Sequence, residues 1–369
     1  MDHLPLLLKI IESGVLANPA KVASYTKTLA TKLAGDGDTK SAEKILRVIE
    51  SSSLLKSAAL THAVSPQSMP VDRDSRFFLA DESNPEIGEL NVHLEPLIQK
   101  SVFEFISFVE NAYLLTQAGV GVSPSMLIYG PPGCGKSYLA KYIAAKLELP
   151  LLTARCDSLI SSLLGSTAKN IRSLFEHASN RPCVLFLDEF DALAKARDDQ
   201  HEVGELKRVV VSLLQNIDSL PSGTILLAAT NHENLLDPAV WRRFAYKLNI
   251  QLPSNEAREK LIKQFLGAFG SANLKSITTA TDGMSGALIK QACEASVRAA
   301  IIEGQGEVDD NKLLAKIAEI QYHDLIHAQT SDEEKIKKLK DANSRLFTTR
   351  VLNELFGVST GKISKILNS

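Results

Sequence analysis

Eight consecutive residues, Gly130–Ser137, have the composition and spacing of a loop that binds phosphate groups. They read Gly-Pro-Pro-Gly-Cys-Gly-Lys-Ser and match the pattern G-x-x-x-x-G-K-[ST]. Glycines let successive backbone N–H groups of such a loop turn inward and surround an anion, and a following helix adds its positive N-terminal end. We expect Lys136 to contact the β- and γ-phosphates of ATP and Ser137 to bind Mg²⁺.

The residues on either side of this loop fit the same interpretation. An apolar run, Met126–Tyr129, precedes the loop and a helical pattern, Tyr138–Leu147, follows it, which is the strand–loop–helix order that the motif requires. Cys134 occupies a variable position of the motif, and a redox-active thiol is the alternative interpretation. The sequence predicts that the nucleotide is contacted by Gly130, Pro131, Pro132, Gly133, Cys134, Gly135, Lys136, Ser137, Tyr138 and Asp188.

A pair of acids, Asp188 and Glu189, follows the apolar run Val184–Leu187 about fifty residues later. Catalytic groups of open α/β sheets gather at the carboxyl ends of strands. We therefore expect Asp188 to support Mg²⁺ together with Ser137, and Glu189 to orient and deprotonate the attacking water. The alternative is a pair of solvated acids at a strand end. Asp191 fits a helix start or an interface better than a metal site.

Composition excludes several classes of protein. The 41 basic and 43 acidic residues nearly balance, which argues against a surface that binds nucleic acid or anionic lipid all round but allows a small basic patch. The four cysteines form no C-x-x-C pair, which is typical of reduced thiols in the cytoplasm. We see no secretory signal and no apolar run of the roughly 18 residues that span a bilayer, so we expect no membrane partner.

Apolar runs that alternate with helical patterns indicate an α/β fold with a parallel sheet between helices. Shifts in pattern along the chain divide it into five units, with helices dominating at both ends. The predicted units are an N-terminal helical domain (1–66), a linker with short strands (67–95), a nucleotide-binding α/β domain (96–252), a helical lid (253–328) and a C-terminal helical unit (329–369).

Together these motifs resemble the AAA branch of the AAA+ ATPases, a family with a P-loop NTPase core and an α-helical lid. The resemblance extends through Ala228–Asn231 and Leu236–Phe244 over about residues 95–320. It implies that Asn231 positions the water near the γ-phosphate and that Arg242 and Arg243 are arginine fingers. The sequence Arg-Arg-Phe at residues 242–244 resembles that of katanin- and spastin-like members of the family. Fingers that act on a neighbouring subunit imply a homo-hexamer, and the turn Gly283–Ala287 resembles the part of the lid that faces the nucleotide.

One stretch departs from the family pattern. Leu163, within Ser162–Ser166, stands where ring translocases of the family carry an aromatic pore-loop residue. An aromatic side chain offers more contact area to an extended polypeptide than leucine does, so the departure argues against strong protein threading. Burial of Leu163 and Leu164 in the core is the alternative.

The last forty residues predict two short helices, Thr348–Phe356 and Thr360–Leu367, around the turn Gly357–Ser359. This pattern resembles a helix-turn-helix, and Thr360, Lys362, Ser364 and Lys365 would then face a DNA groove. Nucleic acid bound through residues 345–369 is thus one possibility, and a three-helix pack that docks on the lid or on a protein is the other.

Three functions agree with these observations. The leading hypothesis is a hexameric, Mg²⁺-dependent ATPase that remodels protein substrates or partner complexes. A DNA-associated ATPase that uses the C-terminal unit is the first alternative. An ATP-gated assembly switch that recruits an effector protein, such as a protease, is the second.

Overall fold

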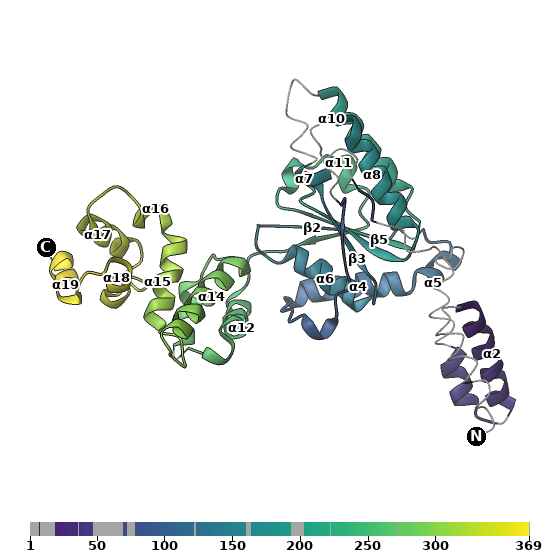
Figure 1. The fold of residues 1–369 in the computed structure, drawn as a ribbon, viewed down its shortest axis with the longest axis horizontal. Helices are drawn as coiled ribbons and strands as arrows, with labels where there is room; N and C mark the ends of the chain where they lie inside the picture. Colours follow the sequence, from purple (N-terminus) through teal and green to yellow (C-terminus); the bar gives the residue numbers. More distant parts are fainter. Residues whose placement is uncertain are drawn as a thin grey trace.

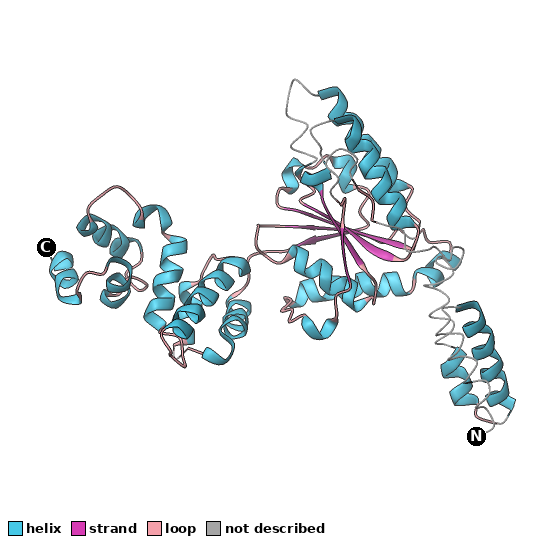
Figure 2. Cartoon of the chain, in the orientation of Figure 1, coloured by secondary structure: helices cyan, strands magenta, loops and turns pink. Residues whose placement is uncertain are grey.

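The computed structural model places helices around one central sheet and extends helical units to either side of it (Figures 1 and 2). The N-terminal and C-terminal helices lie at opposite ends of the molecule (Figure 1). The structure describes residues 7, 19–35, 37–46, 69–71, 78–121, 123–159, 164–192, 203–221, 223–271 and 273–368.

The sheet has six strands in the order β1-β3-β4-β5-β2-β6. Five of them run parallel to one another, and β1 pairs antiparallel with β3 at the edge. The strands are β1 (Asp81–Ser83), β2 (Ser125–Tyr129), β3 (Leu151–Arg155), β4 (Cys183–Asp188), β5 (Thr224–Thr230) and β6 (Tyr246–Asn249). The central strand β5 is buried along its whole length, as expected for a parallel sheet covered on both faces.

Helices cover both faces of this sheet. Helices α4 (Pro96–Glu110) and α6 (Lys136–Lys146) share one apolar core with the sheet, and α8 (Leu164–Ser179) and α10 (Val203–Asp218) share the other. Shorter helical segments connect these elements: η1 (Ile87–Glu89), α5 (Ala112–Gln117), α7 (Cys156–Leu159), η2 (Glu233–Leu235) and α11 (Pro238–Trp241). The predicted α/β fold is confirmed.

Beyond β6 the described chain is helical. Side chains at the N-caps of α12, α13, α14 and α15 accept hydrogen bonds from the first turn of each helix, which satisfies donors that a helix start leaves free. The lid consists of α12 (Asn255–Leu266), η3 (Gly267–Phe269), α13 (Leu274–Ala280), α14 (Gly286–Ile302) and α15 (Asp310–Gln321). These helices bury an apolar core of their own, separate from the two cores of the sheet.

A further core joins α15 to the C-terminal helices. It contains Ala315 and Ala318 of α15 as well as side chains of every helix after it, and Tyr322 packs edge-on against Phe347. These helices are α16 (His323–Ile326), α17 (Asp332–Ala342), α18 (Thr349–Phe356) and α19 (Thr360–Asn368). One face of α15 thus belongs to the lid and the other to the C-terminal helices.

The described residues of the N-terminal third form helices and one short strand. Helix α2 (Pro19–Gly35) and a helical segment at 39–46 agree with the predicted helical domain, whose remaining residues lie outside the described part of the chain. Within the residues of the predicted linker, Val71 and Phe78 form an isolated antiparallel bridge, and the short strand β1 pairs with the open edge of β3. Among the described residues, no helix combines the length and apolar composition needed to cross a membrane.

Candidate nucleotide site

Three glycines give the loop between β2 and α6 its shape. Gly130, Gly133 and Gly135 have φ angles of 141°, 74° and 91°, a region that side chains with a Cβ atom avoid. A Cβ atom on Gly130 would lie 1.9 Å from the carbonyl oxygen of Ile250, so only glycine fits there. Helix α6 begins at Lys136, two residues earlier than predicted, and its N-terminal end therefore faces the loop directly.

Lys136 is almost completely buried, with 7% of its surface exposed. Its Nζ donates hydrogen bonds to the carbonyl oxygens of Gly130 and Pro131, each at 2.8 Å. Burial lowers the pKa of the ammonium group, and the nearby carboxylates of Asp188 and Asp191 partly oppose that shift. The lysine is thus held within the loop, with its charge directed at the space that the loop encloses.

Ser137 connects the loop to the acids at the end of β4. Its Oγ donates a hydrogen bond of 2.7 Å to Oδ2 of Asp188, and Oδ1 of Asp188 accepts one of 2.9 Å from the backbone N–H of Glu189. The structure therefore brings together two motifs that lie about fifty residues apart in the sequence. A hydroxyl and a carboxylate oxygen side by side form the donor set that Mg²⁺ prefers.

Glu189 adopts a left-handed backbone conformation, with φ at 53°. Such a conformation is uncommon for a residue other than glycine and carries strain. The backbone N–H of Phe190 donates to the carbonyl oxygen of Ala229 at 2.8 Å, which anchors this turn to β5. The Glu189 carboxylate lies 3.4 Å from Nη2 of Arg155, at the end of β3, and both side chains are about half exposed. No pattern in the sequence indicates this Arg155 contact, because the contact joins the ends of two different strands.

Asn231 follows β5 directly and is fixed through its backbone. Its N–H donates to Oδ1 of Asp191 at 3.5 Å, and Asp191 is 5% exposed. Strand β5 lies beside β4 in the sheet, so Asn231 and Glu189 emerge at the same carboxyl edge. Asp191 therefore contacts the neighbouring turn from a buried position.

A cavity of about 480 Å³ adjoins the loop, within the range of ligand pockets. Its walls come from the loop and α6, the segment before α4, the end of β6, and the lid helices α12 and α14. Residues that the sequence did not single out line much of it: Asn91, Val92, His93, Leu94, Glu95, Ile98, Gln251, Pro253, Ala257, Leu261, Gln264, Phe265 and Lys290. The predicted contacts Gly133, Cys134, Gly135, Lys136, Ser137 and Tyr138 also line the cavity.

The lid touches the loop at one tight point. The backbone N–H of Ala287 donates to the carbonyl oxygen of Gly133 at 3.0 Å. A Cβ atom on Gly133 would lie 2.6 Å from Oγ of Ser285 and 2.9 Å from Cβ of Ala287. The turn at the start of α14 therefore rests on the backbone of the loop, and the nucleotide-facing role of Gly283–Ala287 stays a prediction.

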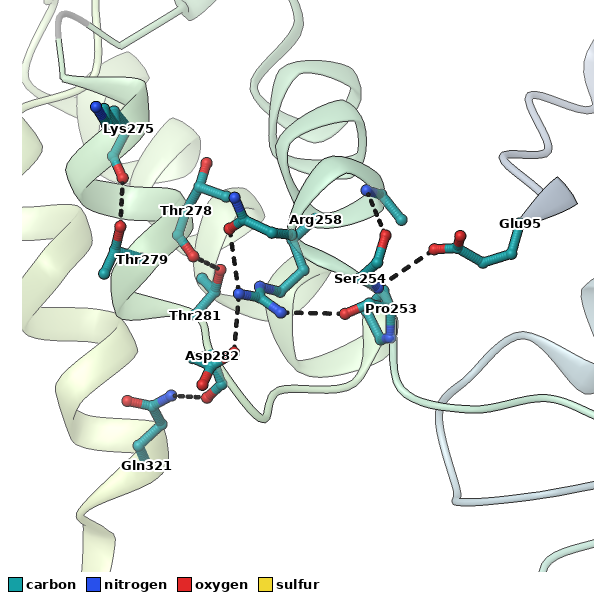
Figure 3. Close-up of polar contacts among 12 residues, drawn as sticks. Glu95, Pro253, Ser254, Arg258, Lys275, Thr278, Thr279, Thr281, Asp282 and Gln321 are labelled. Carbon is teal, nitrogen blue, oxygen red and sulfur yellow. Dashed lines mark hydrogen bonds and ion pairs between the residues drawn. The ribbon is translucent and has the colours of Figure 1, made fainter.

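A buried arginine holds the first residues of the lid against the lid helices (Figure 3). The side chain of Arg258, on α12, is 9% exposed and forms an ion pair with Asp282 at 2.9 Å. Its Nη1 also donates to the carbonyl oxygen of Pro253 at 3.1 Å. Glu95 accepts a hydrogen bond of 3.4 Å from the N–H of Ser254. Two cavity-lining residues, Glu95 and Pro253, are thus fixed to the lid.

The two predicted arginine fingers differ in their surroundings. Arg243 forms an ion pair with Asp218 of α10 at 2.9 Å and donates to the carbonyl oxygen of Ala239 at 2.9 Å. Arg242 is exposed and makes no side-chain contact of this kind with any described residue. Among the described residues, Arg243 is thus held by two side-chain contacts, whereas the Arg242 side chain has none of this kind. The pore-loop residue Leu163 lies outside the described residues.

Comparisons with known proteins identify the family. The model of the AAA family, "ATPase family associated with various cellular activities", matches residues 126–252, which include the loop, both acids and Asn231. An uncharacterized AAA family ATPase of Sinorhizobium fredii is 44% identical over 227 residues, which cover 61% of this chain and 69% of that protein. The chain belongs to the AAA family of ATPases. This AAA protein therefore binds and hydrolyses ATP.

Two further similarities describe the same region of this AAA protein. The proteasome-activating nucleotidase of Sulfurisphaera tokodaii is 30% identical over 246 residues, which cover 64% of this chain and 62% of the nucleotidase. The AAA domain of FIGL-1, solved in complex with ADP, has a TM-score of 0.52 and 29% identity over 60% of this chain and 77% of that domain. The chain thus spans less than two thirds of the nucleotidase, and the similarity is confined to part of each protein.

Proposed function

We propose that this chain is a Mg²⁺-dependent ATPase that assembles into a homo-hexameric ring and remodels protein substrates or partner complexes in the cytoplasm. The 2.7 Å contact between Ser137 and Asp188 carries the chemical part of the proposal, because it joins the phosphate loop to the acids that follow β4. The matches to a proteasome-activating nucleotidase and to the 26S proteasome regulatory subunit 6A of Schizosaccharomyces pombe support a protein substrate.

The residues of the loop hold the triphosphate in this mechanism. Backbone N–H groups of Gly133–Ser137 and the N-terminal end of α6 surround the β-phosphate. Lys136 exchanges its bonds to the Gly130 and Pro131 carbonyls for bonds to phosphate oxygens. Ser137 and Asp188 would hold Mg²⁺, which neutralises phosphate charge when bound. The cavity between the loop and the lid receives the adenosine, and its apolar residues cover the base.

Glu189 accepts a proton from the attacking water in the hydrolytic step. The water oxygen forms a bond to the γ-phosphorus, and the bond from that phosphorus to the β,γ-bridging oxygen breaks. Arg155 holds the Glu189 carboxylate at the strand edge through the 3.4 Å contact, and Asn231 helps to position the water from the adjacent strand end. General-base assistance of this kind contributes about 10²–10⁴ in rate.

Arg242 acts on the pocket of a neighbouring subunit in this proposal, and Arg243 keeps the α11 turn in place. The support is the contrast between an exposed Arg242 and an Arg243 tied to Asp218. A guanidinium is always charged and presents a planar fork to phosphate oxygens. An arginine finger can contribute roughly 10³–10⁵ to the rate of nucleotide hydrolysis.

Mixing two inactive variants tests the assembly. Lys136→Ala lacks a working pocket but keeps its Arg242, and Arg242→Ala keeps the pocket but lacks the finger. Each variant alone should hydrolyse ATP at most at about a hundredth of the wild-type rate, and the mixture should recover a substantial part of that rate. A mixture that stays inactive, although co-purification of differently tagged variants shows mixed hexamers, would place Arg242 outside the neighbouring pocket.

A second measurement addresses the substrate class. An unfolded protein, such as reduced and carboxymethylated α-lactalbumin, should raise the ATP turnover of the wild-type chain several-fold, whereas the same protein in its native fold should not. Equal turnover in the presence and absence of unfolded protein would count against a remodelling function and leave the ATPase assignment intact.

A further inference from the structure

The helices α17, α18 and α19 form a compact pack, here called the C-terminal three-helix unit (residues 332–368). Helices α18 and α19 are joined by the short turn Gly357–Ser359, in which Gly357 has a φ of 66° and donates its N–H to the carbonyl oxygen of Asn353 at 2.8 Å. The Asn353 side chain donates to the carbonyl oxygen of Val358 at 3.0 Å and so closes the turn. Two helices on a short glycine-containing turn, supported by a third helix, are the geometry of a helix-turn-helix.

The charge of this unit differs from that of the whole chain. The unit contains eight basic and five acidic residues, whereas the chain as a whole has a net charge of −2. Three of the five acids, Asp332, Glu333 and Glu334, lie in the first turn of α17, so that only two acids remain between Lys335 and Asn368. Five of the basic side chains are exposed and form no ion pair with any described residue. They are Lys337, Arg345, Arg350, Lys362 and Lys365.

Helix α19 has one buried face and one polar face. Ile363 and Ile366 point into the core, with 0% and 7% of their surface exposed, and Leu367 packs against the same core. The other positions are occupied by small, hydroxyl, amide and lysine residues, without a single acid. The exposed residues of this helix are Thr360, Gly361, Lys362, Ser364, Lys365 and Asn368. Such side chains donate hydrogen bonds to phosphate oxygens and to base edges.

The position of the unit leaves that polar face accessible. Helix α18 contributes Val351 and Leu352 to the core that it shares with α15 of the lid. Glu354, the one acid of α18, lies near Lys312 of α15 and raises the pKa of that lysine, second to Glu303. Helix α19 lies at the outer end of the molecule, on the far side of the lid from the sheet (Figure 1). Helix α18 and its Glu354 therefore face the lid, whereas α19 faces away from it.

We propose that the C-terminal three-helix unit binds double-stranded DNA, with the polar face of α19 in the major groove and Lys362 and Lys365 on the phosphates. The major groove of B-form DNA is about 12 Å wide and admits an α-helix, whereas the major groove of duplex RNA is deep and narrow. The charge complementarity between this unit and the phosphate backbone selects a nucleic acid over a second protein as the occupant. This binding goes beyond the proposed remodelling activity.

Binding of a labelled duplex by the full chain tests the inference. Fluorescence anisotropy with a mixed-sequence DNA of about 30 base pairs, over sodium chloride from about 50 to 200 mM, gives the affinity and its salt dependence. The double variant Lys362→Gln/Lys365→Gln should bind at least about tenfold more weakly, and the slope of log K against log salt should become shallower by about 1.8, or roughly 0.9 for each lost phosphate contact. Duplex RNA of the same sequence should bind more weakly than the DNA.

A matched variant controls for net charge. Lys260→Gln/Lys275→Gln removes two exposed lysines of the lid that form no ion pair with described residues and should bind DNA within about twofold of the wild-type affinity. Both double variants should keep the wild-type melting temperature, because all four side chains lie on the surface. Wild-type chain that binds no duplex at low salt, equal losses in the two variants, or equal affinity for RNA and DNA would each overturn the proposal.

Discussion

Replacement of Gly133 by alanine should detach the lid from the phosphate loop. The added Cβ would lie 2.6 Å from Oγ of Ser285 and 2.9 Å from Cβ of Ala287, whereas ordinary contacts between such atoms measure about 3.5 Å. The start of α14 would have to retreat by roughly 0.7 Å. The bond from the Ala287 N–H to the Gly133 carbonyl, now 3.0 Å, would then exceed the length of a hydrogen bond.

The loss of that bond sets the size of the effect. One backbone hydrogen bond contributes about 0.5–1.5 kcal/mol, so the Ala287 amide should exchange with deuterium up to about tenfold faster in Gly133→Ala. Gly135→Ala is the matched control, since Gly135 also has a positive φ of 91° but a Cβ there would meet no atom within 4 Å. Gly135→Ala introduces the same backbone strain, about 1–2 kcal/mol, but its added Cβ does not clash with the lid. Equal exchange of the Ala287 amide in the two variants would refute the reasoning.

Three further predictions concern other contacts of the site. Arg155→Met should lower ATP turnover about tenfold, because a misplaced base slows the chemical step, with little change in melting temperature, since an exposed ion pair contributes at most about 1 kcal/mol. Arg258→Met should lower the melting temperature by several degrees, because the lid junction loses its ion pair and hydrogen bonds. Alkylation of Cys134 by iodoacetamide should require a higher pH than that of an unburied thiol, since burial raises its pKa, while Cys183 and Cys293, whose thiol pKa burial raises to about 12, should stay unmodified.

Two exposed arginines provide the matched controls for Arg155→Met and Arg258→Met. Arg172→Met removes an exposed ion pair with Glu176 on α8, and Arg298→Met removes an exposed side chain on α14. Both should leave turnover and melting temperature at wild-type values. If Arg172→Met slows hydrolysis as much as Arg155→Met, the contact to Glu189 is not specific. For the thiols, saturating ATP should slow the reaction of Cys134, and equal rates with and without ATP would contradict its position at the pocket.

The phosphate loop and the acids after β4 could be predicted from the sequence because each is a contiguous pattern. Binding of a triphosphate depends on backbone N–H groups and on side chains at neighbouring positions. All of these groups belong to the continuous segment Gly130–Ser137, so the segment alone predicts phosphate binding. The acids after β4 can be predicted in the same way, because five consecutive apolar residues directly precede Asp188 and Glu189. The structure then places the two patterns 2.7 Å apart at Ser137 and Asp188.

The wall of the cavity could not be predicted in this way. Asn91 and Glu95 precede α4, whereas Pro253 and Ala257 belong to the lid junction, and only the fold brings these segments together. None of them carries a pattern of its own. The buried side chain of Arg258 is a similar case, because in the sequence it is one arginine among many charges of an amphipathic helix. Pairwise contacts between distant elements, such as Arg155 with Glu189, need the strand order before they can be inferred.

The isosteric change Glu189→Gln tests the central chemical claim most directly. ATP affinity, measured by titration calorimetry, should stay within about twofold of the wild-type value, while turnover should fall by about 10²–10⁴. Glu148→Gln is the matched control, because Glu148 is also exposed and left-handed, with a φ of 54°, but lies at the opposite end of α6 from the loop. Wild-type turnover by Glu189→Gln, or an equal loss in Glu148→Gln, would contradict the assignment of Glu189 as the base.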